Sequence, residues 1–292
     1  MMITFVTYNI QYSKGKDGRY DLERIADAVR GADVIALQEV TRNMAGVPEA
    51  DQPAALGGLL ADYFWIYGPP VDVDSGTRGS DGRPVNRRTQ FGNMILSRFP
   101  ILSSRLLLLP RNRSYDMPNT QSGALEGVVD LPSGPLRVYD VHLNSRNHAE
   151  RILQIDDLLP WLFDHRRDGG ALTGPVWLGG LGEVPMPEDF VVMGDCNFAP
   201  GSPEYCRMVG EPDYYHGTRV VAHHLVDSWT HVGNAIDQGV TWHDETDDWQ
   251  TRLRLDYGFV SAGLAAQLAA ARIDEDAAGS DHQPYWFDLD TG

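Results

Sequence analysis

Residues 190–198 read FVVMGDCNF, a short apolar run that ends in Asp195 and Asn197. Such runs are typical of buried strands, and a rigid strand end is a good place to hold side chains for binding or catalysis. Four other runs meet polar residues in the same way: residues 3–9 end in Asn9, 33–40 contain Glu39, 136–143 contain His142 and lead to Asn144, and 285–289 follow Asp281 and His282. Asp256 lies in a further predicted strand, residues 255–260. The pattern predicts that polar side chains from distant parts of the chain converge on one site.

The remaining periodicity predicts an α/β fold with two sheets. Turn-bounded apolar runs predict further strands at residues 64–67, 91–96, 106–109 and 124–131. Apolar residues three and four apart predict helices at 21–30, 149–163 and 203–209, the first capped by Asp21. The glycine- and proline-rich stretch 169–187 is interpreted as an insertion loop, because site motifs lie on both sides of it. We therefore expect a single domain spanning residues 1–292.

Composition narrows the class of protein. The formal net charge is −17, with 41 acidic and 24 basic residues, which argues against a protein that simply coats nucleic acid, although a local basic patch leaves a nuclease open. Two cysteines do not make a disulfide framework. The chain starts with a predicted strand rather than a signal peptide and has no run of about 20 apolar residues. We expect a cytoplasmic monomer, with a removed leader left open.

The polar residue types suit one kind of chemistry. Asn9, Glu39 and Asp281 offer the hard oxygen ligands that Mg²⁺ takes. The two cysteines of the sequence are too few to suggest a zinc site built on thiolates. His282 and Asp256 together make a base held by a carboxylate, which would activate a water for attack on a phosphate.

Seven motifs carry a family resemblance over nearly the whole chain: TYN (7–9), LQEV (37–40), GNMILSR (92–98), VHL (141–143), GDCN (194–197), LDY (255–257) and SDH (280–282). In this order they resemble the endonuclease/exonuclease/phosphatase superfamily, which includes pancreatic DNase, the neutral sphingomyelinases and the inositol polyphosphate 5-phosphatases. The resemblance implies a four-layer α/β sandwich, in which two packed mixed β-sheets are flanked by helices and the site lies at one end.

The resemblance also implies roles for the individual residues. It makes Glu39 the principal ligand of Mg²⁺ or Mn²⁺, with Asn9 and Asp281 beside it. It makes Asp195 and Asn197 the pair that orients the water and the phosphate. His282, paired with Asp256, becomes the general base, and His142 binds the scissile phosphate or assists the leaving group.

Substrate contacts are predicted more loosely. Residues 78–151 hold 11 arginines and 6 acidic residues, a local balance of +5 in an acidic chain. Arg88 and Arg111, in or beside loops near the predicted site, are therefore expected to hold a substrate phosphate or head group. Three more residues are expected to contact the substrate: Asn93, Asn144 and His243.

Three functions follow in order of preference. The first is divalent-metal-dependent hydrolysis of a phosphate ester, preferably a phosphodiester of a lipid head group or small molecule. The second is a nuclease acting on DNA or RNA. The third is a catalytically silent binding scaffold, which the presence of the full set of site residues argues against. For a lipid substrate, the apolar loop at residues 174–181 is a candidate for transient membrane contact.

Overall fold

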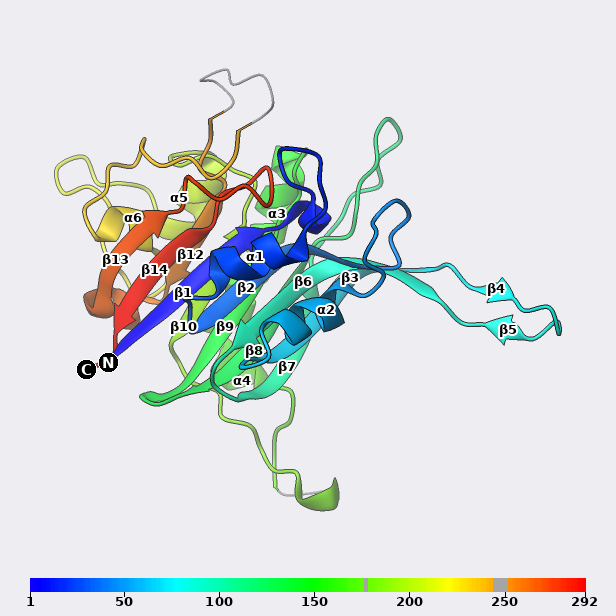
Figure 1. The fold of residues 1–292 in the computed structure, drawn as a ribbon. Coiled ribbons are helices and arrows are strands. Elements are labelled where there is room, and N and C mark those ends of the chain that lie inside the picture. Colours follow the sequence, from blue (N-terminus) through cyan, green and yellow to red (C-terminus); the bar gives the residue numbers. More distant parts are fainter. Residues whose placement is uncertain (176–177, 244–251) are drawn as a thin grey trace.

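Two six-stranded sheets form the centre of the computed structural model, which describes residues 1–175, 178–243 and 252–292 (Figure 1). The first sheet has the order β13 (Leu268–Ile273), β14 (Tyr285–Asp290), β1 (Met2–Asn9), β2 (Val34–Arg42), β6 (Arg88–Ser97), β3 (Phe64–Asp74). The second has the order β11 (Val226–Asp227), β12 (Asp256–Val260), β10 (Phe190–Asp195), β9 (Gly134–His142), β8 (Gly123–Leu131), β7 (Ile101–Leu108). Each sheet is mixed, because β1 runs parallel to β2 and β9 runs parallel to β10 while their other neighbours pair antiparallel.

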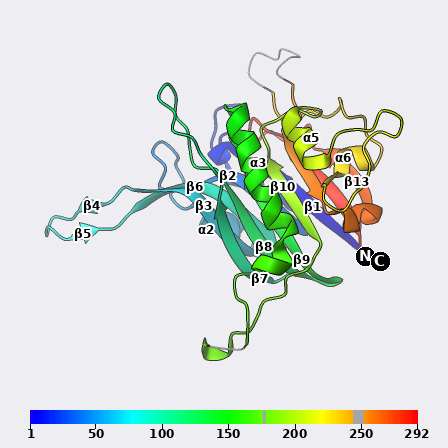
Figure 2. The ribbon, with the colours of Figure 1, turned by 180° about the vertical axis from the view of Figure 1, so that it is seen from behind.

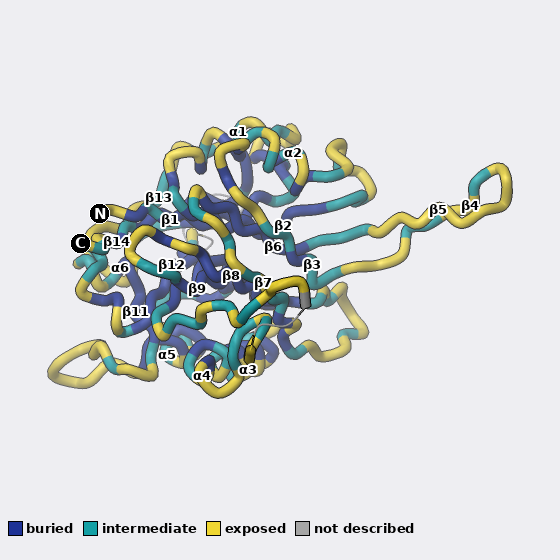
Figure 3. The backbone as a smooth tube through the Cα atoms, turned by 90° about the horizontal axis from the view of Figure 1, so that it is seen from below, coloured by how far each residue is buried: buried dark blue, intermediate teal, exposed yellow. Residues whose placement is uncertain are grey.

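Helices cover the outer face of each sheet and complete the four layers that the family resemblance implies (Figure 3). On the first sheet, α1 (Leu22–Val29) and α2 (Gln52–Leu59) pack over the apolar side chains of β1, β2 and β6. On the second, α3 (His148–Phe163) and α5 (Pro203–Val209) pack over β9, β10 and β12, and Figure 2 shows α3 lying across this sheet. The shorter helices are α4 (His165–Asp168) and α6 (Ser228–His231).

The alternation of side chains along each strand decides which residues face the interior between the sheets. In β1, Val6 and Tyr8 point toward α1, whereas Ile3 and Phe5 fill the space between the sheets. Because the period of a strand is two residues, Thr7 and Asn9 continue the inner face. The inner face of β1 is thus apolar over its first residues and polar over its last residues, which lie next to the site.

The structure adds elements that the sequence pattern did not predict. Helix α2 contains Gly57 and Gly58, which weaken helix propensity, and β13 reads LAAARI without apolar alternation. Strand β3 continues well past residue 67 through a bulge near Gly68 and joins β6 through an exposed hairpin arm, β4 (Thr77–Arg78) and β5 (Pro84–Val85), which projects from the body in Figure 1. Within the described ranges, no helix is both long and apolar enough to cross a membrane.

Candidate active site

Strand register brings the polar strand ends of the second sheet side by side. Asp195 at the end of β10 pairs in register with His142 of β9 on one side and with Asp256 of β12 on the other. All three lie on the inner face, since Val191 and Met193 of the same β10 face fill the core between the sheets. Across the gap, Asn9 ends β1, and Glu39 lies inside β2, at an irregularity in its pairing with β6 between Leu37 and Val40. The fold therefore brings residues of five strands to one place.

Asp195 is the meeting point of these side chains. Its Oδ2 accepts a hydrogen bond from Asn9 Nδ2 at 3.0 Å and lies 3.6 Å from His142 Nε2 and 3.7 Å from His282 Nε2. Asn9 Nδ2 also donates to Glu39 Oε1 at 3.2 Å, and His142 Nε2 lies 4.0 Å from the same oxygen. Residues separated by as many as 273 positions in the chain therefore share one cluster of hydrogen bonds and close contacts, as the sequence predicts.

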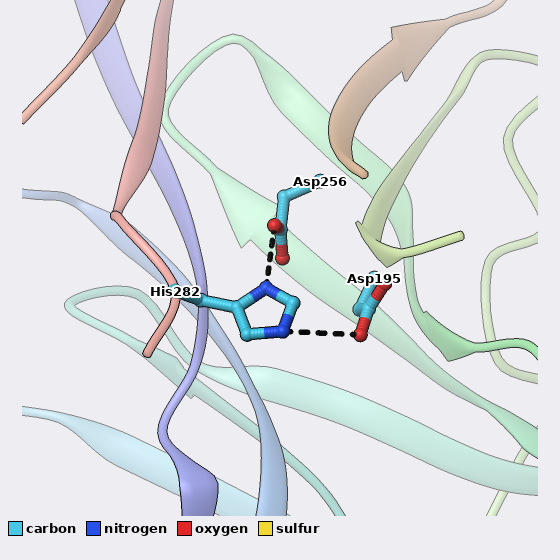
Figure 4. Close-up of side chains that lie close together, drawn as sticks. All are labelled: Asp195, Asp256 and His282. Atoms are coloured by element: carbon cyan, nitrogen blue, oxygen red, sulfur yellow. Dashed lines mark hydrogen bonds and ion pairs between the residues drawn. The ribbon is translucent and has the colours of Figure 1, made fainter. Parts of the chain in front are cut away.

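His282 and Asp256 form a hydrogen-bonded pair (Figure 4). His282 Nδ1 donates to Asp256 Oδ2 at 2.8 Å, which leaves Nε2 directed toward Asp195. Burial lowers the pKa of His282, but the negative charges of Asp256, Asp195 and Asp281 outweigh burial and raise it to about 10. Burial raises the pKa of Asp256 as well, to about 6. In this cluster the proton of the pair belongs on the imidazole, whose orientation is set by Asp256.

The carboxylates of the cluster are not paired with a lysine or arginine side chain in the described part of the chain. Within the described residues, no ion pair joins Glu39, Asp195, Asp256 or Asp281 to a lysine or an arginine. Burial raises the pKa of Glu39 and of Asp195, as expected for carboxylates removed from water without a full counter-charge. A set of oxygen donors with excess negative charge fits a hard divalent cation such as Mg²⁺.

Two groups of residues are candidates for holding such a cation. Asp195, Asp256 and His282 present ligand atoms within 4.8 Å of one another. In that group, however, Asp256 is hydrogen-bonded to His282, and an imidazole is a poorer ligand for Mg²⁺ than a carboxylate. Glu39 and Asp281 are the better candidates: both carboxylates are less enclosed than Asp256, and the charge of Asp281 acts on Glu39, Asp195 and His282 alike.

Two amides serve mainly to position the carboxylates. Asn9 turns its Nδ2 toward Glu39 and Asp195, while its Oδ1 accepts from the backbone N–H of Gln11 at 3.1 Å. In this orientation Asn9 braces the two carboxylates, and direct ligation of a metal through Oδ1 requires the amide to turn over. The backbone N–H of Asn197 donates to Asp195 Oδ1 at 3.0 Å, and its side chain donates to Leu143 O.

The backbone is strained at two of the candidate site residues. Glu39 (φ 61°) and Asn197 (φ 54°) adopt left-handed conformations, which cost L-residues about 1 kcal/mol or more. Gly194, directly before Asp195, has φ 144°, and a Cβ there would meet Val141 O at 1.9 Å. The close approach of β10 to β9 beside His142 therefore requires glycine at this position.

Sequence comparison identifies the family. The model of the Endonuclease/Exonuclease/phosphatase family matches residues 6–282, which is nearly the whole chain. The chain belongs to this family. A search of curated proteins finds no match.

Solved structures of the same superfamily share the fold. An endonuclease/exonuclease/phosphatase from Beutenbergia cavernae is 22% identical with a TM-score of 0.66, covering 99% of this chain and 71% of that one. The mannosyl-6-phosphatase Bt3783 of Bacteroides thetaiotaomicron is 17% identical with a TM-score of 0.63, covering 98% of each chain. The 3′ phosphatase NExo from Neisseria, bound to product DNA hairpin, is 18% identical with a TM-score of 0.59, covering 99% of each.

The residues predicted to contact the substrate form hydrogen bonds and ion pairs outside the cluster around Asp195. Arg88 lies at the base of the exposed arm and pairs with Asp72 at 2.7 Å, and Arg111 donates to Asn119 O. His243 contacts Lys16 Nζ through Nε2 at 3.2 Å. Asn144 lines the cavity beside Glu39 and His142, but its Nδ2 donates to Glu150 and Asn119. Tertiary pairing of this kind is not visible in the sequence.

A second polar layer lies directly beneath the cluster around Asp195. Gln38 Nε2 donates to Thr7 Oγ1 at 3.0 Å and to Asp140 Oδ1 at 2.7 Å. Asn93 Nδ2 donates to the same Asp140 Oδ1 and to its backbone O, and Asn93 also lines the cavity beside Glu39 and His142. Thr7 precedes Asn9 by two residues on the same strand face, and Asp140 precedes His142 in the same way. The layer thus ties the two sheets together just below the site.

We predict that Asp140→Asn changes stability in a pH-dependent way. Burial raises the pKa of Asp140 well above its usual value, even though Gln38 and Asn93 donate to it. Between the unfolded pKa of about 4 and the raised folded pKa, the folded state binds more protons, so the free energy of unfolding falls as pH rises. The variant lacks this loss, so its stability relative to the parent should increase between about pH 5 and pH 8.

Urea unfolding at the two pH values measures the effect. The matched control is Asp130→Asn, an exposed position on β8, whose stability difference should be the same at both pH values. The prediction is contradicted if the free energy of unfolding of Asp140→Asn minus that of the parent stays constant or falls between pH 5 and pH 8.

Proposed function

We propose that the chain hydrolyses a phosphate ester, preferably a phosphodiester of a small molecule, with the help of a divalent cation. One observation carries the proposal: four carboxylates and two imidazoles converge at the strand ends with no lysine or arginine paired to the carboxylates within the described residues. Membership of the family and the phosphatases among its structural relatives support phosphate-ester hydrolysis in broad terms.

The residues divide the reaction among them. Glu39, braced by Asn9, and Asp281 would hold Mg²⁺ or Mn²⁺, which would supply positive charge to the phosphate oxygens and offset the carboxylates that raise the pKa of His282. His282 Nε2 accepts a proton from the attacking water, and Asp256 stabilises the resulting imidazolium. The new bond joins water oxygen to phosphorus, and the bond from phosphorus to the alcohol oxygen breaks, with its electron pair leaving on that oxygen, which takes up a proton from solvent to give the free alcohol.

His142 is placed to serve the phosphate rather than the water. Burial lowers its pKa, which favours the neutral imidazole. Its ring packs against Phe91 at 6.1 Å, and its Nε2 lies between Glu39 and Asp195. We assign it to hydrogen bonding with a phosphate oxygen, while Asp195 and Asn197 orient the water and the phosphate.

The described surface favours a small substrate over a lipid or nucleic acid. Arg146 is the only lysine or arginine among the described residues that line the cavity beside the cluster, whereas a nucleic-acid groove needs several cations. Of the apolar loop at residues 174–181, Val176 and Trp177 lie outside the described residues, and Leu181 is exposed.

Metal removal tests the proposal. We expect the protein to cleave bis(p-nitrophenyl) phosphate in Mg²⁺ or Mn²⁺, to lose at least about 99% of that rate in excess EDTA, and to regain it when the metal is restored. Circular dichroism in EDTA controls for unfolding. A rate that survives EDTA in a folded protein, or no cleavage of any mono- or diester with either metal, refutes the proposal.

A further inference from the structure

A cavity of about 380 Å³ opens beside the catalytic cluster, with Glu39 and His142 among its lining residues. Its other walls come from the start of β6, from the loop of residues 111–122 between β7 and β8, and from residues 143–147 between β9 and α3. Since Glu39 and His142 belong to the site proposed for the phosphate, the rest of the cavity is where the alcohol part of a substrate would lie.

The walls of this cavity are held by a buried carboxylate. Glu150, in the first turn of α3, is fully buried and accepts hydrogen bonds from Asn112 N at 2.8 Å, Asn119 Nδ2 at 3.0 Å and Asn144 Nδ2 at 2.8 Å. Gln154, one turn further along α3, joins both loops in the same way: Nε2 donates to Pro110 O, and Oε1 accepts from Asn144 N. Both loops are therefore fastened to one helix, and the cavity is a preformed part of the fold.

Several polar groups in the cavity remain without a partner after these bonds are made. Among the residues that the structure describes, the hydroxyls of Thr120, Ser122 and Ser145 and the guanidinium of Arg146 make no hydrogen bond or ion pair. Ser122 is only 8% exposed, whereas Thr120, Ser145 and Arg146 are exposed. Hydroxyls both donate and accept, whereas a guanidinium only donates.

We infer that this cavity binds the leaving alcohol of the substrate and selects a hydroxyl-rich alcohol, a sugar or another polyol, with Arg146 as the principal specificity residue. This inference rests on the proposed function. A polyol matches the mixture of donors and acceptors, because each of its hydroxyls can pair with a serine or threonine hydroxyl and offer an oxygen to Arg146.

Other alcohols fit the cavity less well. A nucleobase calls for aromatic faces to stack on, and Phe91 is the only aromatic residue among those lining the cavity in the described structure. An acyl or alkyl chain calls for continuous apolar walls, whereas leaving Ser122 and Arg146 without partners would cost binding energy. The family membership does not choose between these alcohols, so the choice depends on the groups in the cavity.

The test compares two linear alcohols of equal carbon number, sorbitol and n-hexanol, each as its terminal phosphate monoester and as the methyl phosphodiester. They share a primary ester and differ in the hydroxyl groups along the chain. We expect kcat/KM to be at least about tenfold higher for the sorbitol ester, and Arg146→Met to reduce this preference about tenfold. Thr120→Val, a second substitution in the cavity, should reduce the preference in the same direction.

The matched control is Arg113→Met, an exposed arginine of the loop of residues 111–122 that stacks over Tyr115 at 4.8 Å and does not line the cavity. It should leave the preference unchanged. Equal kcat/KM for the two esters, a preference for hexyl, or an equal loss on both esters in Arg146→Met overturns the inference while the proposed hydrolysis stands. If the unmodified protein cleaves neither these esters nor bis(p-nitrophenyl) phosphate, the proposed function itself fails.

Discussion

Replacing Glu39 with glutamine should lower kcat/KM at least about a thousandfold, which corresponds to about 4 kcal/mol of transition-state stabilisation. The substitution keeps the size of the side chain and its hydrogen bond with Asn9, but it removes the negative charge proposed to hold the cation. Affinity for Mn²⁺, measured by titration calorimetry, should fall together with the rate.

The control for this variant is Glu23→Gln, an exposed position in the first turn of α1, for which the rate should not change. A folded Glu39→Gln protein that keeps more than about a tenth of the parent rate excludes Glu39 as the principal ligand. Loss of rate with unchanged Mn²⁺ affinity gives Glu39 a role other than metal binding.

His282→Ala should lower kcat about 10² to 10⁴-fold, the range typical for loss of a general base. Asp256→Asn should cause a loss of similar size, because an amide accepts only weakly from Nδ1 and does not stabilise the imidazolium. Since the two residues act as a unit through their 2.8 Å hydrogen bond, the double variant should be scarcely slower than His282→Ala alone.

The pH dependence of kcat/KM separates this role from a merely structural one. Asp256 raises the pKa of His282, so its removal should lower that pKa and move the acidic limb of the Asp256→Asn profile to lower pH. If the acidic limb does not move, or if the losses of the two single variants multiply in the double variant, His282 and Asp256 do not form one base.

The catalytic cluster was predictable because it follows from local pattern. An apolar strand with a period of two aims every second side chain at the core, and a polar residue at the end of that face, such as Asn9 or Asp195, must point into the space between the sheets. The motif order then carried the resemblance to the family, which implies that the site lies at one end of two packed sheets. The two-sheet sandwich and its main helices followed from the same periodicity.

The substrate side was not predictable because it depends on pairing between distant segments. Arg88 pairs with Asp72 and Asn93 with Asp140, and neither partner can be identified from its neighbours in the chain. Arg146 stands out only after Glu150 has fastened the loop of residues 111–122 to α3. Its one sequence signal is its position four residues after His142, in the turn from strand to helix.

The position of a bound Mn²⁺ ion, located by anomalous scattering in crystals soaked with the metal, tests the central claim most directly. The account predicts a peak within about 2.0–2.3 Å of carboxylate oxygens of Glu39 and Asp281, with the hydrogen bond between His282 and Asp256 intact. A peak on the alternative group, Asp195, Asp256 and His282, with that hydrogen bond broken, would remove the proposed base and contradict the account.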